Sequence, residues 1–112
     1  MEFKQSEIDN VVLIEISGEL MGGKEAEDFK SVLFELINNE KLNIVVDLQR
    51  ATWMNSSGLG MLVAGLTSMR SSGGDLRLAN LSERIRQPFE ITRLDTIFKT
   101  FDSLDDAVKS FQ

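Results

Sequence analysis

The stretch NIVVDL at residues 43–48 decides the fold class of this chain. It is a short and nearly continuous apolar run, which is typical of a central strand covered on both faces. Helical patterns flank it, because apolar residues recur every three or four positions over residues 26–37 and again over residues 59–69. A buried strand between two amphipathic helices indicates an α/β sandwich with a largely parallel sheet.

Further strands extend this pattern towards both ends of the chain. Residues 11–16 (VVLIEI) form a β-branched run that we expect to end at Ser17-Gly18. Residues 2–8 are a weaker strand, expected to pair with it antiparallel through a turn at residues 9–10. Residues 76–79 predict another strand, and residues 97–101 predict a short one. The sheet is therefore expected to be mixed and mostly parallel.

Two shorter helices complete the predicted fold. Ser82 is the expected N-cap of one helix, and Pro88 should kink or restart it, because proline lacks the amide that bonds back along the turn. The other helix is expected over residues 104–111, capped by Ser103 or Asp102. We therefore predict one domain over residues 1–112, with about four α-helices on a mixed sheet.

The composition excludes several classes of function. The chain has no histidine and no cysteine, which removes the usual general base, the usual metal ligands and the cysteine nucleophile. We therefore expect neither a metal nor a cofactor. A net charge of −6 disfavours binding to nucleic acid or to an anionic membrane. No signal peptide and no apolar run of ~18 residues is visible, so we expect a cytoplasmic location without membrane insertion.

The segment MNSSGLG at residues 54–60 is the strongest candidate for a functional site. It follows the buried strand and opens a helix, and open α/β sheets present their sites at the carboxyl ends of their strands. Asn55 or Ser56 can cap the helix, while Gly58 and Gly60 keep its first turn free of side chains. A phosphoryl group on Ser56 would add roughly −1.5 to −2 charges, and the helix dipole stabilises such an anion by ~0.3–1 kcal/mol. Ordinary capping explains the same residues, and both interpretations are open.

Two enzymatic interpretations are weaker. GELMGGK at residues 18–24 nearly matches a phosphate-binding loop, which makes a nucleotide-binding protein using Gly23 and Lys24 a remote alternative. However, Glu25 stands where a hydroxyl should meet the metal ion. Nucleophilic hydrolysis by Ser56 or Ser57 fails, because the glycine of a nucleophile elbow and the histidine of a Ser-His pair are both missing. We therefore predict that the chain is not an enzyme.

The second helix carries a further clue on the side that we expect to be exposed. Met61, Ala64, Gly65 and Ser68 leave this side low in charge and small in side chains. Such a face suits docking of a partner. It equally suits packing beneath a neighbouring helix, and the sequence leaves both explanations open.

The whole chain resembles a STAS domain, the fold of bacterial anti-sigma factor antagonists. The resemblance is carried by residues 16–20 (ISGEL), 45–48 (VVDL), 54–60 (MNSSGLG) and 91–98 (ITRLDTIF), in the family's order. It implies a signal-transduction protein that is phosphorylated on a serine by a partner, which is both a kinase and an anti-sigma factor. In that family the unphosphorylated antagonist binds this partner and frees the sigma factor for transcription. Phosphorylation blocks binding, and a serine phosphatase resets the cycle.

By this resemblance Ser56 is the phosphorylation site, and the docking surface comprises the loop after residue 20 and the start of the second helix. The partner-binding residues that it implies are Met21, Gly22, Asn55, Ser57, Gly58, Leu59 and Met61. We expect a monomer that exchanges partners. An unmodified scaffold of the same fold, in a multiprotein signalling or membrane-transport complex, is the alternative function.

Two positions depart from the family pattern. Asn55 replaces the acid that usually precedes the serine, and Met21 stands where an acid commonly follows Gly-Glu-Leu. Asn55 can still cap a helix, so the local fold should survive while recognition by the kinase changes. Fewer acids beside Ser56 also lower the repulsion that a phosphoserine would meet.

Overall fold

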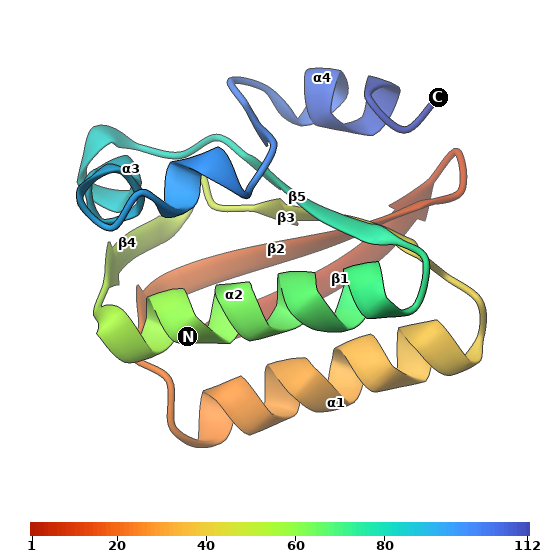
Figure 1. The fold of residues 1–112 in the computed structure, drawn as a ribbon, viewed down its shortest axis with the longest axis horizontal. Helices are drawn as coiled ribbons and strands as arrows, with labels where there is room; N and C mark the ends of the chain where they lie inside the picture. Colours follow the sequence, from red (N-terminus) through yellow and green to blue (C-terminus); the bar gives the residue numbers. More distant parts are fainter.

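A mixed sheet with strand order β1-β2-β3-β5-β6 organises the computed structural model, which describes all 112 residues (Figure 1). The strands are β1 (Glu2–Ile8), β2 (Val11–Leu20), β3 (Asn43–Asp47), β4 (Ala51–Met54), β5 (Asp75–Ala79) and β6 (Thr100–Phe101). Only the β1–β2 pair is antiparallel, and β4 pairs with β2 alone. The helices are α1 (Lys24–Asn38), α2 (Ser56–Ser71), α3 (Glu83–Ile91) and α4 (Leu104–Lys109), with a 3-10 turn at Leu94–Thr96. The predicted α/β class, mixed sheet and four helices are confirmed.

Helices α1 and α2 cover one face of the sheet, α4 covers the other face, and α3 lies at the end beside β4 (Figure 1). The larger core, beneath α1, α2 and α3, contains 23 buried residues, and a second cluster of five lies beneath α4. Strand β3 contributes to both, since Ile44 and Val46 face the larger core while Val45 faces the smaller one. This two-sided burial explains the continuous apolar run at residues 43–48.

Local side-chain chemistry sets the ends of several elements. The β1–β2 hairpin turns at Asp9 and Asn10, whose φ angles of 50° and 64° are those of a two-residue type I′ turn. The hydroxyl of Ser82 accepts a hydrogen bond from the Ile85 amide at 3.3 Å, so Ser82 caps α3 as predicted. Ser103, rather than Asp102, caps α4 in the same way.

Three sequence-based expectations for the strands differ from the structure, and one of the two alternatives for Pro88 is excluded. Strand β2 does not end at Ser17-Gly18 but continues to Leu20, because Gly18 adopts a φ of 89° and lets the strand bend onward. Strand β4 was not predicted. The last strand spans only Thr100–Phe101 instead of residues 97–101. Helix α3 passes through Pro88 without restarting and gives up one backbone hydrogen bond there.

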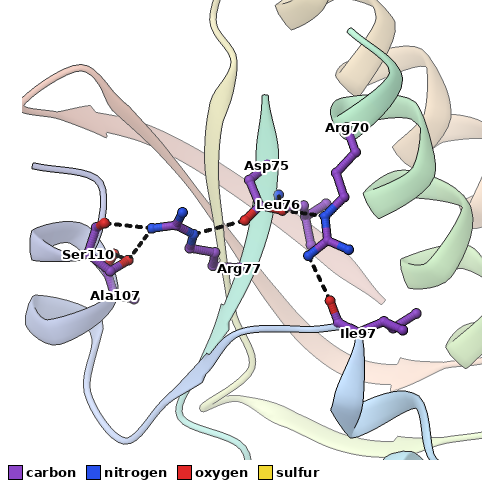
Figure 2. A network of polar contacts seen from close by, with 7 residues as sticks. All are labelled: Arg70, Asp75, Leu76, Arg77, Ile97, Ala107 and Ser110. Carbon is purple, nitrogen blue, oxygen red and sulfur yellow. Dashed lines mark hydrogen bonds and ion pairs between the residues drawn. The ribbon is translucent and has the colours of Figure 1, made fainter. Parts of the chain in front are cut away.

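A network of polar contacts joins the far end of α2 to β5 and α4 (Figure 2). The Asp75 carboxylate accepts hydrogen bonds from Nε of Arg70 and Nε of Arg77, both at 3.0 Å. Arg70 also donates to the Ile97 carbonyl at 2.7 Å, and Arg77 donates to the carbonyl and hydroxyl of Ser110 at 2.7 and 2.8 Å. Burial raises the pKa of Asp75, but hydrogen bonds from Arg77 and Arg70 outweigh it and hold this pKa below its ordinary value of 3.8.

The helices are short relative to a bilayer. The longest, α2, has 16 residues, and none of the four combines the length and apolar character that crossing a membrane requires.

Candidate functional site

Ser56 is the first residue of α2, and the preceding residue, Asn55, sets where this helix begins. The Asn55 side-chain oxygen accepts a hydrogen bond from the Gly58 amide at 2.8 Å, and the Asn55 carbonyl accepts one from the Leu59 amide at 3.0 Å. Asn55, and not Ser56, is therefore the N-cap. The side chains of Ser56 and Ser57 are exposed, and their amides lie in the first turn, where no helical carbonyl is available to accept from them.

The end of β2 packs tightly against this first turn, and two glycines make the approach possible. The Asn55 amide donates to the Leu20 carbonyl at 3.1 Å. A Cβ on Gly58 would lie 2.1 Å from the Leu20 oxygen, and one on Gly22, whose φ is 81°, would lie 2.6 Å from Cβ of Ser57. The loop after β2 therefore packs directly against the start of α2.

The electrostatics around Ser56 are favourable for an added anion. The first turn of α2 contains no acidic residue, and the two neighbours that depart from the family pattern, Asn55 and Met21, are uncharged. A helix N-terminus carries a partial positive charge that attracts anions. The structure thus places an accessible hydroxyl at a positive helix end without a competing carboxylate in the same turn.

The structure divides the predicted partner-binding residues into two sets. Met21 is 44% exposed, Ser57 is exposed and Asn55 is half-buried, so a partner can touch these three. The others are buried and offer a partner little accessible area. They are Gly22, Gly58, Leu59 and Met61.

A groove of about 580 Å³ lies between α1 and α2 on the surface where the two helices meet. Met61 and Gly65 line it but are both buried, and a Cβ on Gly65 would lie 2.9 Å from Cδ1 of Leu33 in α1. Ala64 is exposed and Ser68 is half-buried in the α2 wall. The expectation that these four α2 residues share an exposed side is therefore wrong for Met61 and Gly65. Met61 belongs to the larger core, and Gly65 is covered by side chains of α1.

The alternative phosphate-binding loop lies at the start of α1. Gly23, with a φ of 68°, precedes Lys24, which is the first and exposed residue of this helix. The first turn also carries Glu25 and Glu27, and these carboxylates oppose a phosphate at that helix end. No group of three acidic side chains comes together as a metal-binding set. The geometry therefore favours the start of α2 over the start of α1 as an anion site.

Sequence reasoning missed one surface residue near the site. Trp53, the single tryptophan of the chain, lies on β4 three residues before Ser56 and is 39% exposed. Thr52 and Trp53 favour strands, so a signal was present. Because β4 has only four residues, its pattern is too short to distinguish a strand from a loop.

The cap at Asn55 supports a direct prediction. Asn55→Ala should lower the free energy of unfolding by about 1 kcal/mol, because the Gly58 amide loses its acceptor. Asn55→Asp should retain the cap, with a further gain of up to about 1 kcal/mol from the helix dipole. Urea unfolding of the three proteins measures both effects. Equal stability of Asn55→Ala and the parent would show that the cap contributes nothing.

Known proteins match this chain over almost its full length. The STAS domain model matches residues 3–107. The anti-sigma-B factor antagonist of Bacillus subtilis (strain 168) is 32% identical over 97 residues, which cover 87% of this chain and 85% of that protein. The crystal structure of a candidate anti-sigma factor antagonist from Thermotoga maritima has a TM-score of 0.87 at 29% identity and covers 96% of this chain and 92% of its own.

A third known protein shares the fold at lower sequence identity. The Bacillus cell fate determinant SpoIIAA in its phosphorylated form has a TM-score of 0.77 at 20% identity and covers 99% of this chain and 100% of its own. At that identity the likeness shows the shared fold. Together with the family match and the relatives at about 30% identity, these findings show that the chain belongs to the STAS domain family, among the anti-sigma factor antagonists.

Proposed function

We propose that this protein is a phosphorylation-switched binding module whose switch is Ser56. In the unphosphorylated state it sequesters an anti-sigma factor that is also a serine kinase, and a sigma factor is thereby freed for transcription. The observation that carries the proposal is the exposed Ser56 hydroxyl at the uncharged, glycine-packed start of α2. The family membership supplies the partner class.

The chemistry of the switch is a phosphoryl transfer in which this chain is the substrate. The kinase moves the γ-phosphoryl group of ATP to Oγ of Ser56, the hydroxyl proton is removed, and ADP is released. The chain needs no catalytic residue of its own for this step. A phosphatase restores the hydroxyl by hydrolysing the ester to inorganic phosphate.

The effect on binding follows from the position of Ser56. Phosphorylation adds roughly −1.5 to −2 charges where the docking surface meets the partner. The helix end stabilises this charge, so the domain should stay folded while its surface changes. Met21, Asn55 and Ser57 would touch the partner, whereas Gly22, Gly58 and Leu59 would hold the surface in shape. The fold shared with phosphorylated SpoIIAA is consistent with a domain that tolerates such a modification.

The proposal is tested with purified serine kinases of the anti-sigma factor type from the same genome. We expect one of them, with ATP, to shift this protein on a phosphate-affinity gel, and Ser56→Ala to abolish the shift. Ser71→Ala, which removes an exposed serine at the far end of α2 and leaves Ser56 in place, is the matched control and should still shift. Ser56→Asp should weaken binding to that kinase at least about tenfold, equivalent to roughly 1.4 kcal/mol.

Two outcomes would contradict the switch. One is the absence of a shift with every kinase tested. The other is a shift that persists in Ser56→Ala. If, in addition, Ser56→Asp binds its partner as tightly as the parent does, the unmodified scaffold of the same fold becomes the better description.

A further inference from the structure

A register shift in the sheet turns Trp53 towards the surface. Gly18 of β2 lies opposite Ala51 of β4, but the next residue, Glu19, lies opposite Trp53, so Thr52 is an extra residue in β4. Side chains of a regular strand alternate between the two faces, and Trp53 would then point to the core as Ala51 does. With the extra residue, Trp53 is 39% exposed. Bulges of this kind often re-aim a side chain beside a functional site.

The exposed residues at the ends of the paired strands β2 and β4 lie near Ser56. Strand β4 leads directly into the start of α2 (Figure 1), and Met21, 44% exposed, follows the end of β2 that pairs with β4. Leu20 and Met54, opposite each other in the register, are buried. Trp53 and Met21 therefore give the molecule two accessible large apolar side chains close to the proposed phosphorylation site.

Trp53 lies within reach of a kinase that docks on Ser56. Its γ-phosphate has to approach Oγ of Ser56 to about 3–3.5 Å. Three extended residues span at most ~11 Å, whereas a standard interface of about 800 Å² per partner has a radius of roughly 16 Å. Trp53 thus lies within the radius of a standard interface centred on Ser56. Tryptophan is among the residues that most often dominate binding energy at such positions.

We propose that Trp53 is the apolar anchor through which the kinase recognises this protein, an inference that rests on the proposed function. The occupant is the kinase surface that delivers ATP to Ser56, and it should carry an apolar pocket for the indole. Glu19, exposed and opposite Trp53, calls for a basic residue at the rim of that pocket. Trp53 is a recognition residue, since the reacting atoms belong to Ser56 and ATP.

The test compares Trp53→Ala with Phe34→Ala in the phosphorylation assay with the kinase panel. Phe34 is an equally suitable aromatic control, because it is 47% exposed and lies beside Ser71 and Ser72 at the opposite end of α2. Trp53→Ala should lower kcat/KM about 30-fold, mainly through KM. Phe34→Ala should match the parent, and Trp53→Phe should recover part of the loss.

A second measurement needs no substitution in the sequence. Because Trp53 is the single tryptophan, fluorotryptophan labels this position alone, and its fluorine NMR signal should shift when the unlabelled kinase binds. Phosphorylation of Trp53→Ala at the parental rate, or an unmoved fluorine signal at saturating kinase, would overturn the anchor while leaving the switch intact. Failure of every kinase to phosphorylate the parent would overturn the switch and the anchor together.

Discussion

Replacing Gly58 by alanine should destabilise the domain by about 3 kcal/mol, the upper part of the range for overpacking a tight core. Alanine normally stabilises a helix relative to glycine by about 1 kcal/mol. A loss of stability on Gly58→Ala would therefore by itself indicate a steric clash. The methyl group would lie 2.1 Å from the Leu20 oxygen and 2.7 Å from the Leu20 carbonyl carbon. These are backbone atoms, so no side-chain rotation relieves the clash, and either β2 or the first turn of α2 must move.

Gly60→Ala provides the matched control in the same helix. A Cβ at Gly60 meets nothing within 4 Å, so this variant should gain about 0.5–1 kcal/mol. Chemical denaturation of both variants gives the comparison directly. If Gly58→Ala were as stable as Gly60→Ala, the close approach of Leu20 to α2 would be wrong. Displacement of the first turn should also slow phosphorylation of Ser56 in Gly58→Ala but not in Gly60→Ala.

Replacing Asp75 by alanine should cost about 2–3 kcal/mol at neutral pH. Its carboxylate is 14% exposed and receives hydrogen bonds from Arg70 and Arg77, and bonds to charged groups contribute about 1.5–3 kcal/mol each. Arg70 contributes less to this stabilisation than Arg77 does, because the Arg70 side chain is 44% exposed and water screens its ion pair with Asp75. Arg77, 13% exposed, would keep its charge in a nearly buried place without its carboxylate partner.

The pH dependence of this effect has a definite sign. The pKa of Asp75 is lower in the folded protein than its ordinary value of 3.8. The stabilisation is therefore complete above about pH 4 and is lost as the pH falls through the lowered pKa. The stability difference between the parent and Asp75→Ala should shrink as the solution is acidified below about pH 4. A difference that grows on acidification would contradict the ion-pair explanation.

Asp105→Ala is the control for removing a carboxylate as such. Asp105 pairs with Lys109 at 3.0 Å on the outside of α4, where both side chains are largely exposed. Exposed pairs contribute little to stability. Thermal unfolding should therefore separate Asp75→Ala clearly from the parent and leave Asp105→Ala close to it.

The main elements of the fold could be predicted from the sequence because their signals are local. Apolar residues at helical spacing define α1 and α2, and a continuous apolar run defines β3. The residues Asp9 and Asn10 suit the type I′ turn that joins β1 to β2. The errors fall where a short segment depends on a distant partner. Strand β4 exists because β2 continues past Gly18 to pair with it, and no local pattern in four residues encodes that pairing.

The candidate site shows the same contrast between local sequence signals and contacts of distant segments. The sequence by itself determined the class of fold, the capped start of a helix at residues 55–56 and the absence of histidine and cysteine chemistry. Only the tertiary structure decided which side chains are accessible, because accessibility depends on contacts between segments far apart in the chain. The packing of α1 buried Gly65, and the register shift between β2 and β4 exposed Trp53. The approach of Leu20 to Gly58 joined two segments, nearly forty residues apart, into one surface around Ser56.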